Sequence, residues 1–198
     1  EASFCAPETI YGRAKLAAET EIISASRQGS IRASVLRLPM VYGLDGFGNL
    51  ARMIDAVARG RFPPFPRLEN HRSAIHVLDA VRAALLCAVH EAASPKTYLV
   101  TDGRGYSTRW IYEQICHGLG RDVPNWALPY WFWTLGARIG TATERITQRP
   151  MPLTVEALRK LSGNAWFSSD KIQSELGFQP RLELGAEIKA MAERYTQA

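Results

Sequence analysis

The chain has 198 residues, 46% of them hydrophobic and 22% charged, a composition typical of a globular protein. Its net charge of +5 comes from scattered basic residues with no aromatic interleaving, which argues against a nucleic-acid surface and suits phosphate-bearing small molecules. The three cysteines, Cys5, Cys87 and Cys116, are widely spaced and have no histidine at ligand spacing. We interpret them as reduced thiols of a cytoplasmic protein, with neither a disulfide framework nor a metal site.

Predicted helices and strands alternate from the first residues to about residue 120. A helical pattern follows Pro7 and stops near Gly29, and the apolar run 31–43 predicts a buried strand that ends at Pro39 and a turn. Helices are then expected over 49–60, 78–93 and 107–120, with short strands over 73–77 and 96–103. This alternation predicts an α/β sheet protein. Only three strands are evident, however, and no G-x-G-x-x-G turn occurs.

From residue 121 onward the sequence predicts helices and irregular segments. Segment 126–140, WALPYWFWTLGARIG, is dense in aromatic and apolar residues. It is shorter than the roughly 20 residues that a membrane span needs, and Arg138 interrupts it. We interpret it as a core or interface helix. The alternative is an aromatic patch that rests on a membrane surface or lines an apolar substrate site.

Tyr11 and Lys15 stand four residues apart at the start of the first predicted helix. Residues at this spacing share a helix face, so the phenol and the ammonium can project into one site. A neighbouring cation favours the phenolate form of a tyrosine, which can then exchange a proton with an alcohol or ketone. The spacing by itself is also met on solvated helix faces, and an exposed pair without function is the alternative.

The surrounding motifs occur in a specific order. Pro7, Tyr11, Gly12, Lys15 and Glu19 are followed by VLRLPMVYG (35–43), HRSAIHVLDAVRAAL (71–85), the segment 97–120 and the closing segment 167–195. Together they closely resemble the extended short-chain dehydrogenase/reductase family, the NAD-dependent sugar epimerases and dehydratases. The resemblance implies an α/β fold: the C-terminal part of a doubly wound Rossmann-type parallel sheet with a smaller, mainly helical substrate-binding portion. Residues 1–120 would form the Rossmann part, with interleaved substrate-binding segments at about 44–75, and 121–198 the helical portion. The glycine-rich NAD-binding half is expected to be absent.

The same resemblance implies roles for individual residues. Tyr11 would transfer the proton, and Lys15 would bind the nicotinamide ribose and assist the tyrosine. The turn at Leu38, Pro39 and Met40 would pass the nicotinamide ring. The substrate would be met by a helix start, a loop and an arginine: Asn49 and Leu50 at the diphosphate, Pro64 and Phe65 at the nucleotide base, and Arg72 at a phosphate oxygen.

Structural roles remain open for several of these residues. Pro39 ends a strand in any case, Asn49 is a good N-cap, and Arg72 can pair with Glu69. His76 lies in a strand pattern and is interpreted as a packed core residue, and Asp79 as a residue that caps or orients the following helix.

We therefore interpret the chain as part of an NAD(P)-dependent sugar-nucleotide epimerase or dehydratase, with a 4-epimerase of a UDP-hexose or UDP-hexosamine in surface polysaccharide synthesis as the specific hypothesis. Met40 and Ser73 depart from the usual residues of such epimerases, which leaves the exact sugar open. The alternatives are a one-way ketoreductase or dehydrogenase of the same family and a non-catalytic substrate-binding or dimerisation fragment. The implied partners are NAD or NADP, a nucleotide-linked or lipid-diphosphate-linked sugar and a second copy of the chain.

Overall fold

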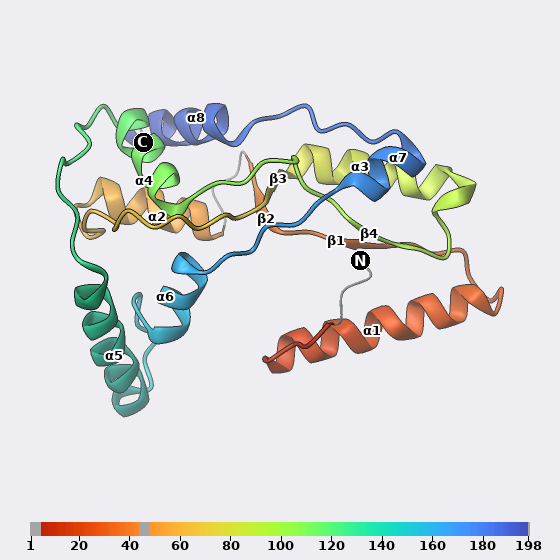
Figure 1. Cartoon of the computed structure of the whole chain (residues 1–198), viewed down its shortest axis with the longest axis horizontal. Helices are drawn as coiled ribbons and strands as arrows, with labels where there is room; N and C mark the ends of the chain where they lie inside the picture. The colour runs from red at the N-terminus through yellow and green to blue at the C-terminus, as the bar shows by residue number, and fades with distance from the viewer. Residues whose placement is uncertain (1–4, 44–47, 198) are drawn as a thin grey trace. The chain divides into compact units, whose positions relative to one another are not determined.

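The computed structural model describes residues 5–43 and 48–197. The predicted substrate-binding segment 44–75 therefore begins with four residues, 44–47, that lie outside the described residues. In chain order the elements are α1 (Ile10–Arg27), β1 (Val35–Arg37), β2 (Met40–Tyr42), α2 (Asn49–Ala58), β3 (Ala74–His76), α3 (Val77–Val89), the 3-10 helix η1 (Glu91–Ala93), β4 (Thr97–Leu99), α4 (Thr108–Gly118), α5 (Tyr130–Thr147), α6 (Val155–Ser162), α7 (Asp170–Leu176) and α8 (Leu184–Gln197) (Figure 1).

These elements form two units that interleave along the chain. Unit 1 consists of Glu1–Val41, Ala74–Arg104 and Phe167–Leu182, and unit 2 of Tyr42–Ser73, Gly105–Trp166 and Glu183–Ala198. This division differs from the expected one at residue 120, because α4 belongs to unit 2 while α7 belongs to unit 1. The reason is packing: α4 lies against α8, whereas α7 lies against β4.

Unit 1 is built on parallel strands. β1 pairs with β4 in parallel, with Val35 opposite Thr97 and Arg37 opposite Leu99, and β2 pairs with β3. Helices α3 and α7 close the core, whose fully buried members include Ile75, Tyr98, Val100 and Ile172. The predicted alternation of helix and parallel strand is therefore confirmed for the described residues.

The run 31–43 was predicted to hold a strand that ends at Pro39 and a turn, and in the structure it holds two short strands. β1 ends at Arg37 and β2 begins at Met40, with Leu38 and Pro39 between them. Proline has no N–H to donate to a ladder and restricts the residue before it, so regular pairing stops at this point. The break turns the chain where β1 ends, and it leaves the Leu38 side chain 43% exposed.

Unit 2 is mainly helical. Helices α4 and α8 pack against each other (Figure 1), and Ile115 of α4 and Ile188 of α8 are both fully buried. Helix α5 packs against α6 and the segment before it, and a Cβ atom at Gly140 would lie only 1.9 Å from the carbonyl oxygen of Leu153. Glycine is therefore required where α5 crosses this segment.

Tyr112 of α4 is 4% exposed and stacks on Phe62, with ring centroids 5.8 Å apart. Burial raises the pKa of Tyr112 to about 12. The unfolded chain ionises this phenol at its ordinary value near 10, so the free energy of unfolding should fall by about 2 kcal/mol between pH 10 and pH 12 through this group. In Tyr112→Phe this part of the alkaline loss should disappear, as urea titrations at both ends of the window will measure. An equal alkaline loss in variant and wild type would contradict the assignment.

Candidate active site

The N-terminal end of α1 presents Tyr11 and Lys15 to solvent. Thr9 is the N-cap, and its hydroxyl accepts a hydrogen bond of 3.0 Å from the Gly12 N–H. A Cβ atom at Gly12 would approach the Cβ of Pro7 to 2.9 Å, so proline and glycine pack together at the helix entry. Tyr11 is 72% exposed, and the Lys15 Nζ lies 5.5 Å from the centroid of its ring. The predicted pair therefore shares one accessible face of α1.

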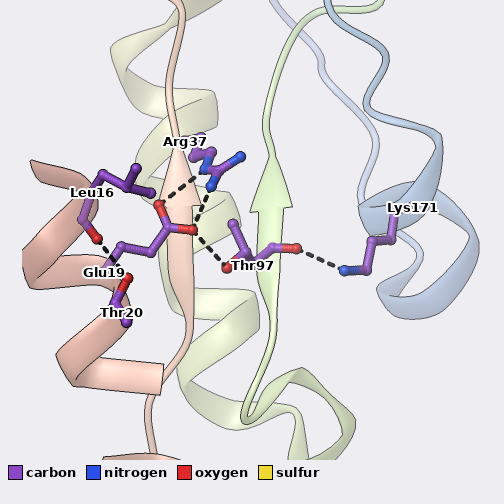
Figure 2. Close-up of polar contacts among 6 residues, drawn as sticks. All are labelled: Leu16, Glu19, Thr20, Arg37, Thr97 and Lys171. Carbon is purple, nitrogen blue, oxygen red and sulfur yellow. Dashed lines mark hydrogen bonds and ion pairs between the residues drawn. The ribbon is translucent and has the colours of Figure 1, made fainter. Parts of the chain in front are cut away.

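Glu19 continues this face by one turn and attaches α1 to the sheet. Its carboxylate accepts two hydrogen bonds from Arg37 of β1, at 2.6 and 3.0 Å, and one of 3.2 Å from the Thr97 hydroxyl of β4 (Figure 2). The hydrogen bond to Glu19 raises the pKa of Arg37. The Thr97 carbonyl in turn accepts a hydrogen bond of 2.8 Å from the Lys171 Nζ of α7. One carboxylate thus joins the helix to both parallel strands. No role was predicted for Glu19, although it stands four residues after Lys15 in the sequence.

Helix α1 runs opposite to β1 and β4, as the order of Leu16 and Thr20 beside the strand arrows shows (Figures 1 and 2). Tyr11 stands two turns before Glu19, about 12 Å along the axis, and is thus displaced from the Glu19–Arg37 contact toward the carboxyl end of β1. Leu38, Pro39 and Met40 leave the strand at that end. In open α/β sheets ligands bind outside the carboxyl ends of the strands, so the expected nicotinamide residues share the appropriate end of unit 1.

The residues expected to bind substrate belong to unit 2, and they differ in how far their side chains are exposed. Asn49 is exposed, but the N-cap of α2 is Gly48, so the capping alternative for Asn49 is wrong. Leu50 is 4% exposed, Pro64 is buried and Phe65 is fully buried. The side chains of these three residues belong to the core, so any contact with substrate would have to come from the backbone at the start of α2 and from the loop, and their assignment stays a prediction.

Phe65 is buried because its ring packs edge-on against Trp133 at a centroid distance of 5.0 Å, and its carbonyl accepts 2.8 Å from the Arg109 Nη1. Arg109 is 7% exposed and also donates to Glu113 at 2.6 Å, so it holds the proline-rich loop on α4. This role of Arg109 was not predicted from the sequence. Its position in the first turn of a helix gave no indication of a partner more than forty residues earlier.

Arg72 is held by its backbone and its side chain. Its N–H and carbonyl exchange hydrogen bonds with Tyr106 at 3.0 and 2.9 Å, and the guanidinium donates to the carbonyls of Lys160 and Gly163 at the end of α6. Burial lowers the pKa of Arg72. The expected pairing with Glu69 is absent from the hydrogen bonds of the described residues, and Arg72 instead satisfies carbonyls at a helix terminus.

His76 and Asp79 have the structural roles that were expected of them. His76 is 2% exposed, and its Nδ1 accepts a hydrogen bond of 3.1 Å from the Leu78 N–H, so His76 caps the N-terminus of α3. Asp79 is fully buried in the first turn of α3, where it pairs with Arg82 and accepts hydrogen bonds from the N–H groups of Arg181 and Leu182. Neither residue is available for catalysis. In the part of the chain that the structure describes, no group of acidic, histidine and cysteine side chains could hold a metal, and no helix is long and apolar enough to cross a membrane.

The family model for the NAD-dependent epimerase/dehydratase family matches residues 1–101, which include Tyr11, Lys15 and the parallel strand pair. The chain belongs to this family. A UDP-glucose 4-epimerase of Vibrio cholerae is 26% identical over 98% of this chain and 56% of its own length. The undecaprenol-linked N-acetylglucosaminyl-diphosphate 4-epimerase of Escherichia coli O157:H7 is 21% identical over 85% of this chain and 51% of its own length. This family member thus spans about half the length of these curated relatives.

Solved structures of the family share the fold of this member. The UDP-glucose 4-epimerase of Thermotoga maritima, solved with UDP-glucose, has a TM-score of 0.67 at 21% identity and covers 97% of this chain and 55% of its own. The dTDP-glucose 4,6-dehydratase of Bacillus anthracis, solved with NAD, has a TM-score of 0.71 at 15% identity over 100% of this chain and 55% of its own. The predicted Rossmann-type α/β fold is confirmed.

Proposed function

We propose that this chain is the part of an NAD(P)-dependent sugar-nucleotide epimerase that carries the proton-transfer residue. The proposal rests on the Tyr11–Lys15 pair. The pair is exposed at the N-terminal end of α1, and this end of the helix lies toward the carboxyl end of β1. Tyr11 accepts the proton of a sugar hydroxyl and returns it, and the Lys15 ammonium stands beside its ring. Leu38, Pro39 and Met40 would border the nicotinamide ring of a bound NAD, which would supply the hydride chemistry.

Similarity to 4-epimerases of UDP-glucose and of a lipid-diphosphate-linked hexosamine supports a hexose or hexosamine substrate in surface polysaccharide synthesis. A cytoplasmic location and a homodimer that uses the helix of Tyr11 and Lys15 belong to the same proposal. NADP remains an alternative cofactor.

The test is product analysis with UDP-glucose and UDP-N-acetylglucosamine. Because the chain spans about half the length of its relatives, the assay uses a protein in which a glycine-rich NAD-binding half precedes these residues. An epimerase should convert each accepted substrate to its C4 epimer without net consumption of NADH. Stoichiometric oxidation of NADH with a reduced product would instead establish the one-way ketoreductase.

The ketoreductase is the second candidate, because a protein of Danio rerio named short-chain dehydrogenase/reductase family 42E member 1 is 26% identical over 87% of this chain. The non-catalytic fragment is the third, since no G-x-G-x-x-G turn occurs in the 198 residues. Calorimetric titration of NAD into the 198-residue chain tests whether the chain by itself has a cofactor site. We expect the isolated chain to bind NAD weakly and to be inactive, and tight binding would contradict this expectation.

Arg72 remains our proposal for the substrate phosphate. A guanidinium that already holds two carbonyls is fixed in orientation, and an anion would offset the cost of its burial. For Arg72→Ala we expect UDP affinity to fall at least about tenfold while NAD affinity is unchanged. Arg67→Ala, an exposed arginine of the same loop, is the matched control. Loss of thermal stability with unchanged UDP affinity would leave Arg72 only its structural role.

A further inference from the structure

Helix α5 has two apolar faces, and the core needs only one of them. Trp133, Ala137 and Gly140 are buried against α6, the segment before it and the proline-rich loop. The opposite face is apolar and exposed, and we call it the aromatic face of α5. Its members, with exposed fractions of 62%, 48%, 49%, 58% and 82%, are Trp131, Phe132, Leu135, Ile139 and Ile146. Side chains of this size on one helix face form an exposed apolar patch, which is typical of a surface that binds a protein or a membrane.

Positive charge borders the aromatic face. Arg138 and Arg145 lie one above the other along one edge of it, and both are exposed. No ion pair among the described residues involves either arginine. The only acidic residue of α5, Glu144, stands four residues after Gly140 and therefore lies on the packed side. The accessible side of the helix thus combines aromatic and aliphatic groups with uncompensated positive charge.

We propose that the aromatic face of α5 binds the surface of an anionic lipid bilayer. An interfacial helix has this pattern: tryptophan, phenylalanine and leucine on the face that enters the headgroup region, and arginines beside it that meet lipid phosphates. Arginine side chains can keep their guanidinium groups at the headgroups while their stems cover apolar surface. The occupant is a bilayer surface and not a bilayer interior, because no described helix is long and apolar enough to span it.

The charge decides between lipid and a second copy of the chain. A self-complementary interface would bring the two arginine edges together without acidic partners on the face, whereas an anionic surface complements them. This inference does not rest on the reaction proposed above, because it concerns a surface of unit 2 and can be measured with the 198-residue chain alone.

The experiment is co-sedimentation of the chain with vesicles of phosphatidylglycerol and phosphatidylcholine in equal parts, and with vesicles of phosphatidylcholine alone. We expect clear binding to the anionic vesicles and at least about tenfold weaker binding to the neutral ones, because two arginines each add about fivefold at a charged surface. The double variant Trp131→Ser, Leu135→Ser should lose binding to both. Absence of wild-type binding to anionic vesicles would overturn the proposal.

The matched control is the double variant Val81→Ser, Leu85→Ser on α3, whose side chains are similarly exposed at 49% and 62%. It should bind vesicles as the wild type does, and an equal loss would show that apolar exposure in general, not this face, drives the binding. Arg138→Gln with Arg145→Gln should lower affinity for anionic vesicles about twenty-fivefold, while the paired lysine substitutions retain it. Sedimentation velocity measures whether the chain is a monomer or a dimer. A wild-type dimer that Trp131→Ser converts to a folded monomer, without vesicle binding, would assign the face to a second copy and overturn the proposal.

Discussion

Tyr11→Phe should lower turnover by about a hundredfold to ten-thousandfold while leaving NAD affinity close to that of the wild type. The reason is that phenylalanine preserves the ring beside Lys15 but removes the oxygen to which we assign the proton exchange in our proposal. Since Tyr11 is 72% exposed and no hydrogen bond of the described residues uses its hydroxyl, the substitution should leave the free energy of unfolding nearly unchanged. Loss of activity can therefore be attributed to chemistry.

The measurement is steady-state turnover in the protein that includes the NAD-binding half, together with NAD titration by fluorescence. The matched control is Tyr195→Phe, which removes the hydroxyl of another partly exposed tyrosine. This hydroxyl belongs to unit 2, where it donates a hydrogen bond of 2.6 Å to Asp55. This control should keep wild-type turnover. If Tyr11→Phe turned over at a rate near that of the wild type, Tyr11 would have no part in the mechanism and the central proposal would fail.

The second large effect concerns stability. Asp79→Ala should lower the free energy of unfolding by about 3 kcal/mol, because it leaves the N–H groups of Arg181 and Leu182 without their acceptor and the Arg82 guanidinium without its carboxylate. The carboxylate is fully buried, so solvent screens these interactions little. Asp79→Asn should cost less, since the amide oxygen retains one acceptor.

Urea denaturation followed by circular dichroism measures both variants. Asp122→Ala, an exposed aspartate in the loop after α4, is the control and should change the unfolding free energy by less than about 0.5 kcal/mol. A change of similar size for Asp79→Ala would mean that segment 181–182 is not anchored to α3 in solution.

Local periodicity was enough to predict the first four helices of this chain. The spacing of apolar residues, Pro7 before the first helix and the glycines that end the helices are properties of neighbouring residues, so α1, α2, α3 and α4 were predicted close to their observed bounds. The order of the motifs also identified the family, which the family model confirms over residues 1–101. The strand predicted to end at Pro39 is shorter in the structure, Val35–Arg37, and the second short strand after the proline was not predicted.

Tertiary structure decided what depends on partners distant in the sequence. Apolar composition does not distinguish Phe65 in the core from Trp131 in solvent, and only the packing of α5 on the proline-rich loop separates them. Likewise the partners of Glu19, Arg72 and Asp79 lie 18 to 103 residues away, at Arg37, Lys160 and Leu182. The sequence by itself determined the family, the helices and the Tyr11–Lys15 pair, because these are local patterns. Which side chains are buried, and which carboxylate attaches the helix of that pair to the sheet, was decided by the fold, because burial and ion pairing are made between segments.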